Sequence, residues 1–323
     1  MTGSTSRLPA AARAIVEGDR RVLARTITAV ENGDPSADAT VRSLYPRSGR
    51  AVVVGITGPL GVGKSSLVNA LVGRLRSLGQ TVGVVGVDPS SPFTGGSVLG
   101  DRIRLERRAD DTGVFFRSMA SRGAAGGVAA ATREVARLLD AAGFDVVLVE
   151  TVGSGQVDVA IRDIASTSVV VLVPHLGDEV QTLKAGLFEI ADVFCVNKVD
   201  LPGADLAQRD LAELVTLGDR TRGWAPRIVG TSTIEPTKGI GELWDNVLAH
   251  EQFLDASGER ARGERQRLAA EIVGVARDRV GHELTERLER DPALRRLLDE
   301  VVARRIDPRA AADRLVRGRP RSR

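Results

Sequence analysis

The sequence of 323 residues has little cysteine, little lysine and few aromatic residues. Its one cysteine, Cys195, excludes a disulfide framework and any cysteine-rich metal site. Aromatic residues make up only 3% of the chain, so the core has to be built from Val, Leu, Ile and Ala. No apolar run approaches the roughly 20 residues that a membrane-spanning helix needs, and residues 1–10 lack the apolar core of a signal peptide. We therefore expect a cytoplasmic protein with no membrane partner.

Excess positive charge is also scarce, since the formal net charge is only +3. A nucleic-acid-binding protein usually carries a dense basic stripe. Here the one basic run is residues 317–323, which is typical of a solvated, disordered tail. We expect no nucleic-acid partner.

Only four of the 45 basic residues are lysines: Lys64, Lys184, Lys198 and Lys238. The chain uses arginine wherever a generic positive charge suffices. Each remaining lysine is therefore a candidate for a position that requires a slim ammonium group and not a planar guanidinium.

Strand-like and helical segments alternate through the middle of the chain. The strand-like segments are residues 51–55, 81–88, 114–119, 145–150, 168–174, 192–197 and 227–230. Helical stretches separate them, for example residues 65–78, 127–142 and 206–217. Several strands are apolar throughout, as are strands buried on both faces. This alternation predicts an open α/β sheet that is mostly parallel and flanked by helices.

The two ends of the chain are predicted to be helical. Residues 8–33 fit two helices broken at Gly18, with Asp19 as the N-cap of the second, and a polar linker follows to residue 50. After about residue 254 the pattern is helical only. Its apolar stripe is Leu268, Ile272, Ala276, Val280, Leu284 and Leu288. Asp307 and Pro308 would open a last helix.

We therefore divide the chain into three parts. Residues 1–50 form an N-terminal helical segment with its linker, residues 51–254 form the central domain, and residues 255–323 form a C-terminal helical arm. Little of the chain remains to cover the stripe of the arm. We expect the stripe to pack on the central domain, on a second copy in a homodimer, or on both.

Residues 57–66, TGPLGVGKSS, contain the phosphate-binding pattern G-x-x-x-x-G-K-S between a strand and a helix. Its glycines allow backbone N–H groups to close around phosphates at a helix N-terminus. Lys64 would reach the β- and γ-phosphates, and the Ser65 hydroxyl would bind Mg²⁺. The predicted nucleotide-binding residues of this loop are Gly58, Pro59, Leu60, Gly61, Val62, Gly63, Lys64, Ser65 and Ser66.

Asn197, Lys198 and Asp200 follow a buried strand and resemble the N-K-x-D motif with which GTPases read guanine. In that motif the Asn and Asp recognise the edge of the base, and the Lys stem lies along it. Ser232 and Thr233 match the loop that supports the base, although most GTPases have Ser-Ala there. Cys195, in the preceding strand, is predicted to be a small core residue.

Residues 150–153, Glu-Thr-Val-Gly, stand where Ras-like GTPases carry D-x-x-G. The Glu variant belongs to a subgroup that contains metallochaperones and cobalamin chaperones. Glu150 would hold Mg²⁺ through water, and Gly153 would approach the γ-phosphate. Ser154 follows, so the usual water-positioning Gln is missing, and the role of nearby Gln156 is left open. We predict a slow intrinsic hydrolase that awaits a partner.

Residues 87–104, VDPSSPFTGGSVLGDRIR, resemble the first switch of the MeaB/ArgK family of P-loop GTPases, to which human MMAA also belongs. Residues 116–123, 150–156 and 177–186 resemble that family's next strand, its second switch and its third switch. The resemblance covers roughly residues 10–317. It implies a P-loop NTPase fold with GTP or GDP and Mg²⁺ as ligands.

The resemblance also implies roles for particular residues. Asp88 ends a strand beside the phosphate loop, where a carboxylate can join Ser65 and Glu150 around Mg²⁺. Asp101 and Arg104 would complete the metal and phosphate contacts. The third switch responds to the mutase, so Asp178 and Lys184 would carry the nucleotide state to the partner.

The implied function is a GTP-hydrolysing chaperone that protects an adenosylcobalamin-dependent acyl-CoA mutase and gates loading or release of its cofactor. An adenosyltransferase is a further possible partner, and no cobalamin site is expected in this chain. Departures from the family pattern at Leu60, Ser154 and His175 leave open which mutase is served.

Other classes fit less well. A nickel- or zinc-insertion GTPase also carries Glu at the Mg²⁺ position and is the main alternative. Such proteins usually show ligand clusters, whereas Cys195, His175, His250 and His282 are scattered. The guanine motif disfavours a kinase or ATPase, and two methionines are too few for a signal-recognition GTPase.

Overall fold

The computed structural model describes residues 8–89, 111–121, 125–151, 161–174, 187–217, 223–234 and 236–317. The chain forms two compact units, Met1–Arg260 and Ala261–Arg323. The N-terminal helices thus belong to the same unit as the central sheet. The three-part division made from the sequence stays a prediction.

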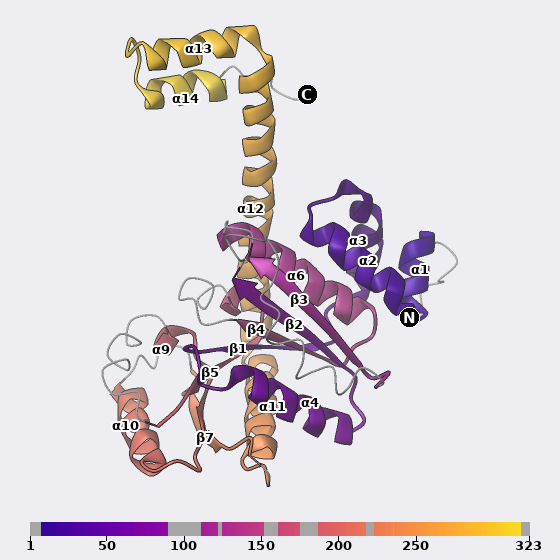
Figure 1. The fold of residues 1–323 in the computed structure, drawn as a ribbon, viewed down its shortest axis with the longest axis vertical. Coiled ribbons are helices and arrows are strands. Elements are labelled where there is room, and N and C mark those ends of the chain that lie inside the picture. The colour runs from indigo at the N-terminus through magenta and orange to yellow at the C-terminus, as the bar shows by residue number, and fades with distance from the viewer. Residues whose placement is uncertain are drawn as a thin grey trace. The chain divides into compact units, whose positions relative to one another are not determined.

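A seven-stranded, wholly parallel sheet forms the centre of the first unit, with strand order β3-β2-β4-β1-β5-β6-β7 (Figure 1). The predicted mostly parallel α/β sheet is confirmed. The strands are β1 Val52–Thr57, β2 Val82–Pro89, β3 Val114–Ser121, β4 Val146–Thr151, β5 Thr167–Leu172, β6 Val193–Asn197 and β7 Arg227–Thr231.

Helices cover both faces of the sheet, which is why β4 and β5 are buried along their whole lengths. Side chains alternate between the two faces: Val146 and Leu148 belong to one core cluster, and Val147 and Val149 belong to the other. Helices α4 (Lys64–Ser77) and α11 (Ile240–Ser257) cover the first face, side by side in Figure 1. Helices α6 (Ala125–Ala141) and α10 (Ala204–Leu217) cover the other.

The N-terminal segment contains α1 (Ala10–Val16) and α2 (Arg20–Glu31). Asp19 caps α2 as predicted, because its carboxylate accepts from the backbone N–H groups of Arg21 and Val22 at 2.9 and 3.0 Å. The predicted linker to residue 50 is wrong in part, since helix α3 (Asp38–Leu44) lies within it, between two 3-10 turns. Its buried contacts, Thr40 and Leu44, are too few to produce a helical pattern in the sequence.

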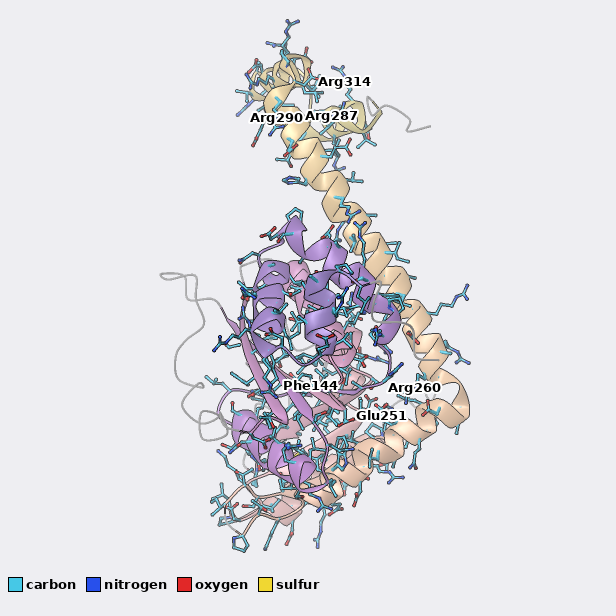
Figure 2. The ribbon with its side chains drawn as sticks, turned by 90° about the vertical axis from the view of Figure 1, so that its right-hand side faces the viewer. Phe144, Glu251, Arg260, Arg287, Arg290 and Arg314 are labelled. Carbon is cyan, nitrogen blue, oxygen red and sulfur yellow. The ribbon has the colours of Figure 1, made fainter. Side chains whose placement is uncertain are left out.

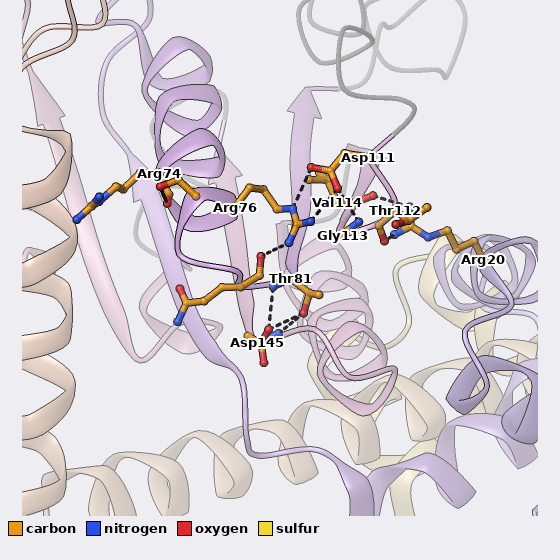
Figure 3. Close-up of polar contacts among 11 residues, drawn as sticks. Arg20, Arg74, Arg76, Thr81, Asp111, Thr112, Gly113, Val114 and Asp145 are labelled. Atoms are coloured by element: carbon orange, nitrogen blue, oxygen red, sulfur yellow. Dashed lines mark hydrogen bonds and ion pairs between the residues drawn. The ribbon is translucent and has the colours of Figure 1, made fainter.

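Strand β3 is tied to the N-terminal segment at its start (Figure 3). Arg20 donates to the carbonyl oxygens of Thr112 and, at 2.6 Å, of Val114. The neighbouring Asp111 is held by Arg76 of α4, whose Nε and Nη2 lie 2.9 and 3.0 Å from its two carboxylate oxygens. Two arginines from different helices therefore fix the point where the chain enters this edge strand.

Helix α12 (Glu259–Arg290) follows α11, and Arg260 donates to Glu251 Oε2 at 2.8 Å where the two helices meet (Figure 2). The arm continues as α13 (Pro292–Val302) and α14 (Pro308–Arg317). Asp307 caps α14 as predicted, accepting from Arg309 N at 2.8 Å. Arg314 and Glu300, 3.2 Å apart, pair α14 with α13.

Leucine and β-branched side chains of the arm remain exposed. The largest exposures are Ile272 at 68%, Val273 at 67% and Val302 at 76%. Among the residues that the structure describes, no helix is both long enough and apolar enough to cross a membrane.

Candidate nucleotide-binding site

The predicted site residues that the structure describes follow the carboxyl ends of β1, β2, β4, β6 and β7 or lie in those strand ends. Because all seven strands are parallel, these ends lie at the same edge of the sheet. Ligands of open α/β sheets bind at this edge. Hydrogen bonds between the loops show that three of these strand ends meet at the phosphate loop.

The loop from Gly58 to Gly63 joins β1 to α4 and requires glycine at both of its ends. Gly58 has φ +141°, and a Cβ there would lie 2.2 Å from the carbonyl oxygen of Val171. Gly63, with φ +93°, is the N-cap of α4, and a Cβ there would lie 2.6 Å from Nδ2 of Asn197. The loop thus leads the chain into a helix N-terminus, which favours bound anions.

Lys64 is buried and bends back into this loop. Its Nζ donates to the carbonyl oxygens of Gly58 at 2.7 Å and Pro59 at 2.8 Å. The ammonium group therefore lies inside the phosphate loop. An ammonium on a flexible stem can fit such a narrow space, whereas a planar guanidinium does not.

Ser65, the next residue of α4, lies against the end of β4. Its Oγ donates to Oε1 of the buried Glu150 at 2.6 Å. A hydroxyl and a carboxylate are the hard oxygen donors that Mg²⁺ takes in nucleotide sites, so these residues fit the metal that the fold implies. The third predicted metal ligand, Asp88, lies on the neighbouring strand β2. It is two residues beyond Gly86, which pairs with Glu150 in the β2–β4 register.

The predicted guanine motif adjoins the phosphate loop. Asn197 at the end of β6 is buried, and its Nδ2 donates to the carbonyl oxygen of Val62 at 2.8 Å. Lys198 has φ +60°, and its Nζ donates to the carbonyl oxygen of Gly61 at 2.9 Å. The motif therefore contacts the loop directly, 135 positions away in sequence.

The loop after β7 supports the same motif. Ser232 donates from Oγ to Oδ1 of the exposed Asp200 at 2.6 Å. The backbone of Ser232 pairs with that of Lys238 through bonds of 3.1 and 3.0 Å. Thr233, which follows Ser232, is half-buried. A carboxylate at the rim, held by a fixed hydroxyl, can accept from a ligand with its other oxygen.

Two residues in this part of the site make contacts that the sequence did not indicate. Thr231 donates from Oγ1 to Oδ1 of Asn197 at 3.1 Å. Cys195, predicted to be core filler, is indeed buried, but its Sγ also lies 3.1 Å from Oγ1 of Thr231. Burial raises the pKa of the Cys195 thiol to about 12, so it stays protonated and can donate to Thr231. In the sequence, the only signal of this role was a threonine at the end of β7.

Several predicted site residues are not part of the described structure. Asp101, Arg104, Gly153, Gln156, Asp178 and Lys184 all lie outside the described residues. Their roles remain predictions.

The sheet, the glycine loop between β1 and α4, and the N-K-x-D motif after β6 define a P-loop GTPase. The family model described as methylmalonyl-CoA mutase-associated GTPase MeaB matches residues 23–289. The chain belongs to this family and is a GTPase, as predicted.

Similar proteins support this family assignment. A putative GTPase of Pyrococcus abyssi is 46% identical over 304 residues, which cover 93% of each chain. The mouse mitochondrial protein named methylmalonic aciduria type A homolog is 30% identical over 325 residues, covering 94% of this chain and 77% of the mouse protein. A crystal structure described as a LAO/AO transport system kinase superposes with a TM-score of 0.71 at 26% identity, covering 98% of this chain and 99% of that one.

Proposed function

We propose that this GTPase is a chaperone of an adenosylcobalamin-dependent acyl-CoA mutase, either methylmalonyl-CoA mutase or a relative. The match to the mutase-associated family over residues 23–289 carries the proposal. The name of the mouse relative supports it, because methylmalonic aciduria points to the same acyl group. GTP binding and hydrolysis would gate loading or release of the mutase cofactor. The cofactor itself would sit on the partners.

The site residues would divide the nucleotide between them. Lys64 and the N–H groups of residues 58–66 would bind the phosphates, since the ammonium already lies inside the loop. Asn197 and Asp200 would read the guanine edge, Lys198 would lie along the base, and residues 232 and 233 would support it. The contact of Asn197 with Val62 supports this arrangement because it places the base-reading motif beside the phosphate loop.

Ser65 and Glu150 would hold Mg²⁺ with the nucleotide, joined by Asp88 and Asp101. The 2.6 Å separation of Ser65 Oγ and Glu150 Oε1 supports this assignment. When bound, Mg²⁺ neutralises phosphate charge. Gly153 would approach the γ-phosphate. The chain lacks a Gln directly after Gly153, so we propose that intrinsic hydrolysis is slow.

Partner coupling is assigned to Arg104, Gln156, Asp178 and Lys184. We further propose a cytoplasmic homodimer that pairs through the helical arm, with the adenosyltransferase as a second partner. The exposed apolar side chains of α12 and α13 support the dimer, because pairing through them would remove apolar surface from water.

The test is GTP hydrolysis by the purified protein with and without the acyl-CoA mutase encoded nearest to it. We expect slow turnover that rises sharply with the mutase. The Lys184→Ala variant should keep its basal turnover and lose most of the stimulation. Turnover that is indifferent to every cobalamin mutase, or that responds to nickel or zinc delivery instead, would refute the client assignment.

A further inference from the structure

Two buried threonine hydroxyls meet behind the proposed phosphate and metal site. Thr57 is the last residue of β1, and Thr151 is the last residue of β4. Thr151 Oγ1 donates to Thr57 Oγ1 at 2.8 Å, and the relative exposures of these residues are 1% and 0%. The two residues are 94 positions apart in sequence, so the contact is made by the fold alone.

Both threonines stand next to functional positions. Thr57 directly precedes Gly58, where the phosphate loop begins, and Thr151 directly follows Glu150. The β1–β4 register ends with Ile56 opposite Glu150. The hydroxyl contact lies one step further along and so extends the pairing to the residues that enter the loops.

The contact lies on the opposite face of the sheet from the site. Ile56 faces the α4 side, and side chains alternate along a strand. Glu150 therefore faces Ser65 of α4, whereas Thr57 and Thr151 face the α6 side. The threonines cannot touch a ligand bound at Ser65, but they join the two strands that carry the phosphate loop and Glu150.

Packing alone does not explain hydroxyls at these positions. In the register, Thr57 lies opposite Val170 of β5, and Thr151 lies opposite Val87 of β2. Valine has nearly the shape of threonine and would fill this apolar layer without placing polar oxygens in it. A buried hydroxyl is unfavourable unless it is hydrogen-bonded. What the threonine pair adds over valine is a directional link between the strand ends.

We propose that Thr57 and Thr151 are a positioning pair for GTP hydrolysis. Their hydrogen bond fixes the end of β4 to the end of β1 and so keeps the Glu150 carboxylate next to Ser65. The pair thereby sets the geometry of the Mg²⁺–nucleotide site from the opposite face of the sheet. This inference rests on the proposed roles of Ser65 and Glu150. It assigns no contact with the nucleotide to either threonine.

The test uses the full chain with Thr57→Val, Thr151→Val and the double variant, and Thr151→Ser as the conservative control. Three quantities are measured: kcat and KM for GTP, the rate of GDP release in excess Mg²⁺ and in EDTA, and the midpoint of thermal unfolding. We expect each valine to lower kcat about five- to tenfold, because a misplaced Glu150 would hold Mg²⁺ less well in the transition state.

Positioning predicts a particular pattern across these measurements. GDP release should become faster in Mg²⁺ by a similar factor, and release in EDTA should change less than about twofold, because only the metal-dependent geometry is disturbed. KM should change little. The losses in the double variant should be smaller than the sum of the two single losses, since both substitutions remove one shared bond. Thr151→Ser, which keeps the hydroxyl, should retain most of the parent kcat that Thr151→Val loses.

A purely structural pair would lower the thermal midpoint and leave kcat and the Mg²⁺ dependence of GDP release unchanged, which would overturn the inference. Glu150→Gln is run alongside. If it alters the Mg²⁺ dependence and the valine variants do not, only the positioning role fails. If Glu150→Gln has no effect either, the proposed metal site fails with it. Should Thr57→Val not fold, Thr151→Val and Thr151→Ser decide the matter.

Discussion

Asn197 Nδ2 donates to the carbonyl oxygen of Val62 at 2.8 Å and so joins the end of β6 to the phosphate loop. The other end of the same amide is held by Thr231, whose hydroxyl donates to Asn197 Oδ1 at 3.1 Å. Both groups of the amide are therefore fixed by the protein. A base reader that is already oriented loses little freedom when it binds its ligand.

Replacing Thr231 with valine should weaken GDP binding about five- to tenfold, because Asn197 Oδ1 loses a buried donor. Titration of fluorescent GDP measures the change, and Thr231→Ser, which keeps the hydroxyl, is the matched control. An unchanged Kd for Thr231→Val would show that the hydroxyl does not orient Asn197.

The Asp200→Asn substitution should exchange the preference for guanine for a preference for xanthine. The carboxylate accepts from N–H groups of guanine, whereas an amide can also donate to the extra carbonyl of xanthine. Ser232 can still donate to the amide oxygen, so the loop should keep its shape.

We expect kcat/KM for GTP to fall by about 100-fold or more, since a site built for hydrogen bonding rejects a mismatched partner strongly, and kcat/KM for XTP to rise. Asp205→Asn, an exposed change on α10, is the control. Equal losses for both nucleotides would contradict a base-reading role.

Much of the sheet could be predicted from the sequence because each of its strands is a local signal. The runs around Val147 and Val170 are apolar on both faces, and no predicted strand end differs from the observed one by more than two residues. Asp19 and Asp307 were identifiable as caps for the same reason, since capping depends on residues only two or three positions apart.

The features of the fold and site that could not be predicted depend on contacts between segments far apart in the sequence. The strand order and the meeting of Thr57 with Thr151 are produced by topology, and no pattern within either segment encodes them. Helix α11 was not predicted, although its apolar residues Leu243, Trp244 and Val247 are buried. Of the site, the phosphate loop and guanine motif could be found as contiguous motifs, whereas Thr231 acts only through Asn197.

Charged substitutions on the arm should break the proposed homodimer. Ile272 and Val273 are exposed by 68% and 67%, so glutamate there removes no buried contact within the chain. Sedimentation equilibrium of Ile272→Glu and Val273→Glu should show a shift from dimer to monomer with unchanged GTPase activity. Leu206→Glu, at 63% exposure on α10, is the control. A dimer that persists in both arm variants would place the interface elsewhere.

His250 should make the protein less stable in mild acid. The side chain is buried, with Nδ1 2.8 Å from Thr167 Oγ1 and Nε2 3.5 Å from Asp192 Oδ1. Burial lowers the pKa of His250 from its ordinary value of 6.5 to about 4. The carboxylate of Glu251 opposes this shift, and the charge of Arg260 adds to it.

Between pH 6.5 and pH 4 the unfolded chain therefore binds a proton at His250 that the folded chain does not. The free energy of unfolding should fall as the pH falls through this window, by roughly 3 kcal/mol from this group. Above pH 6.5 His250 should cause no change of stability with pH. Urea unfolding at pH 7.5, 5.5 and 4.5 measures the change for the parent protein and for His250→Gln, with the exposed His282→Gln as control. The parent and His282→Gln should lose stability more steeply than His250→Gln. Parallel losses in all three would show that His250 is not the group that titrates.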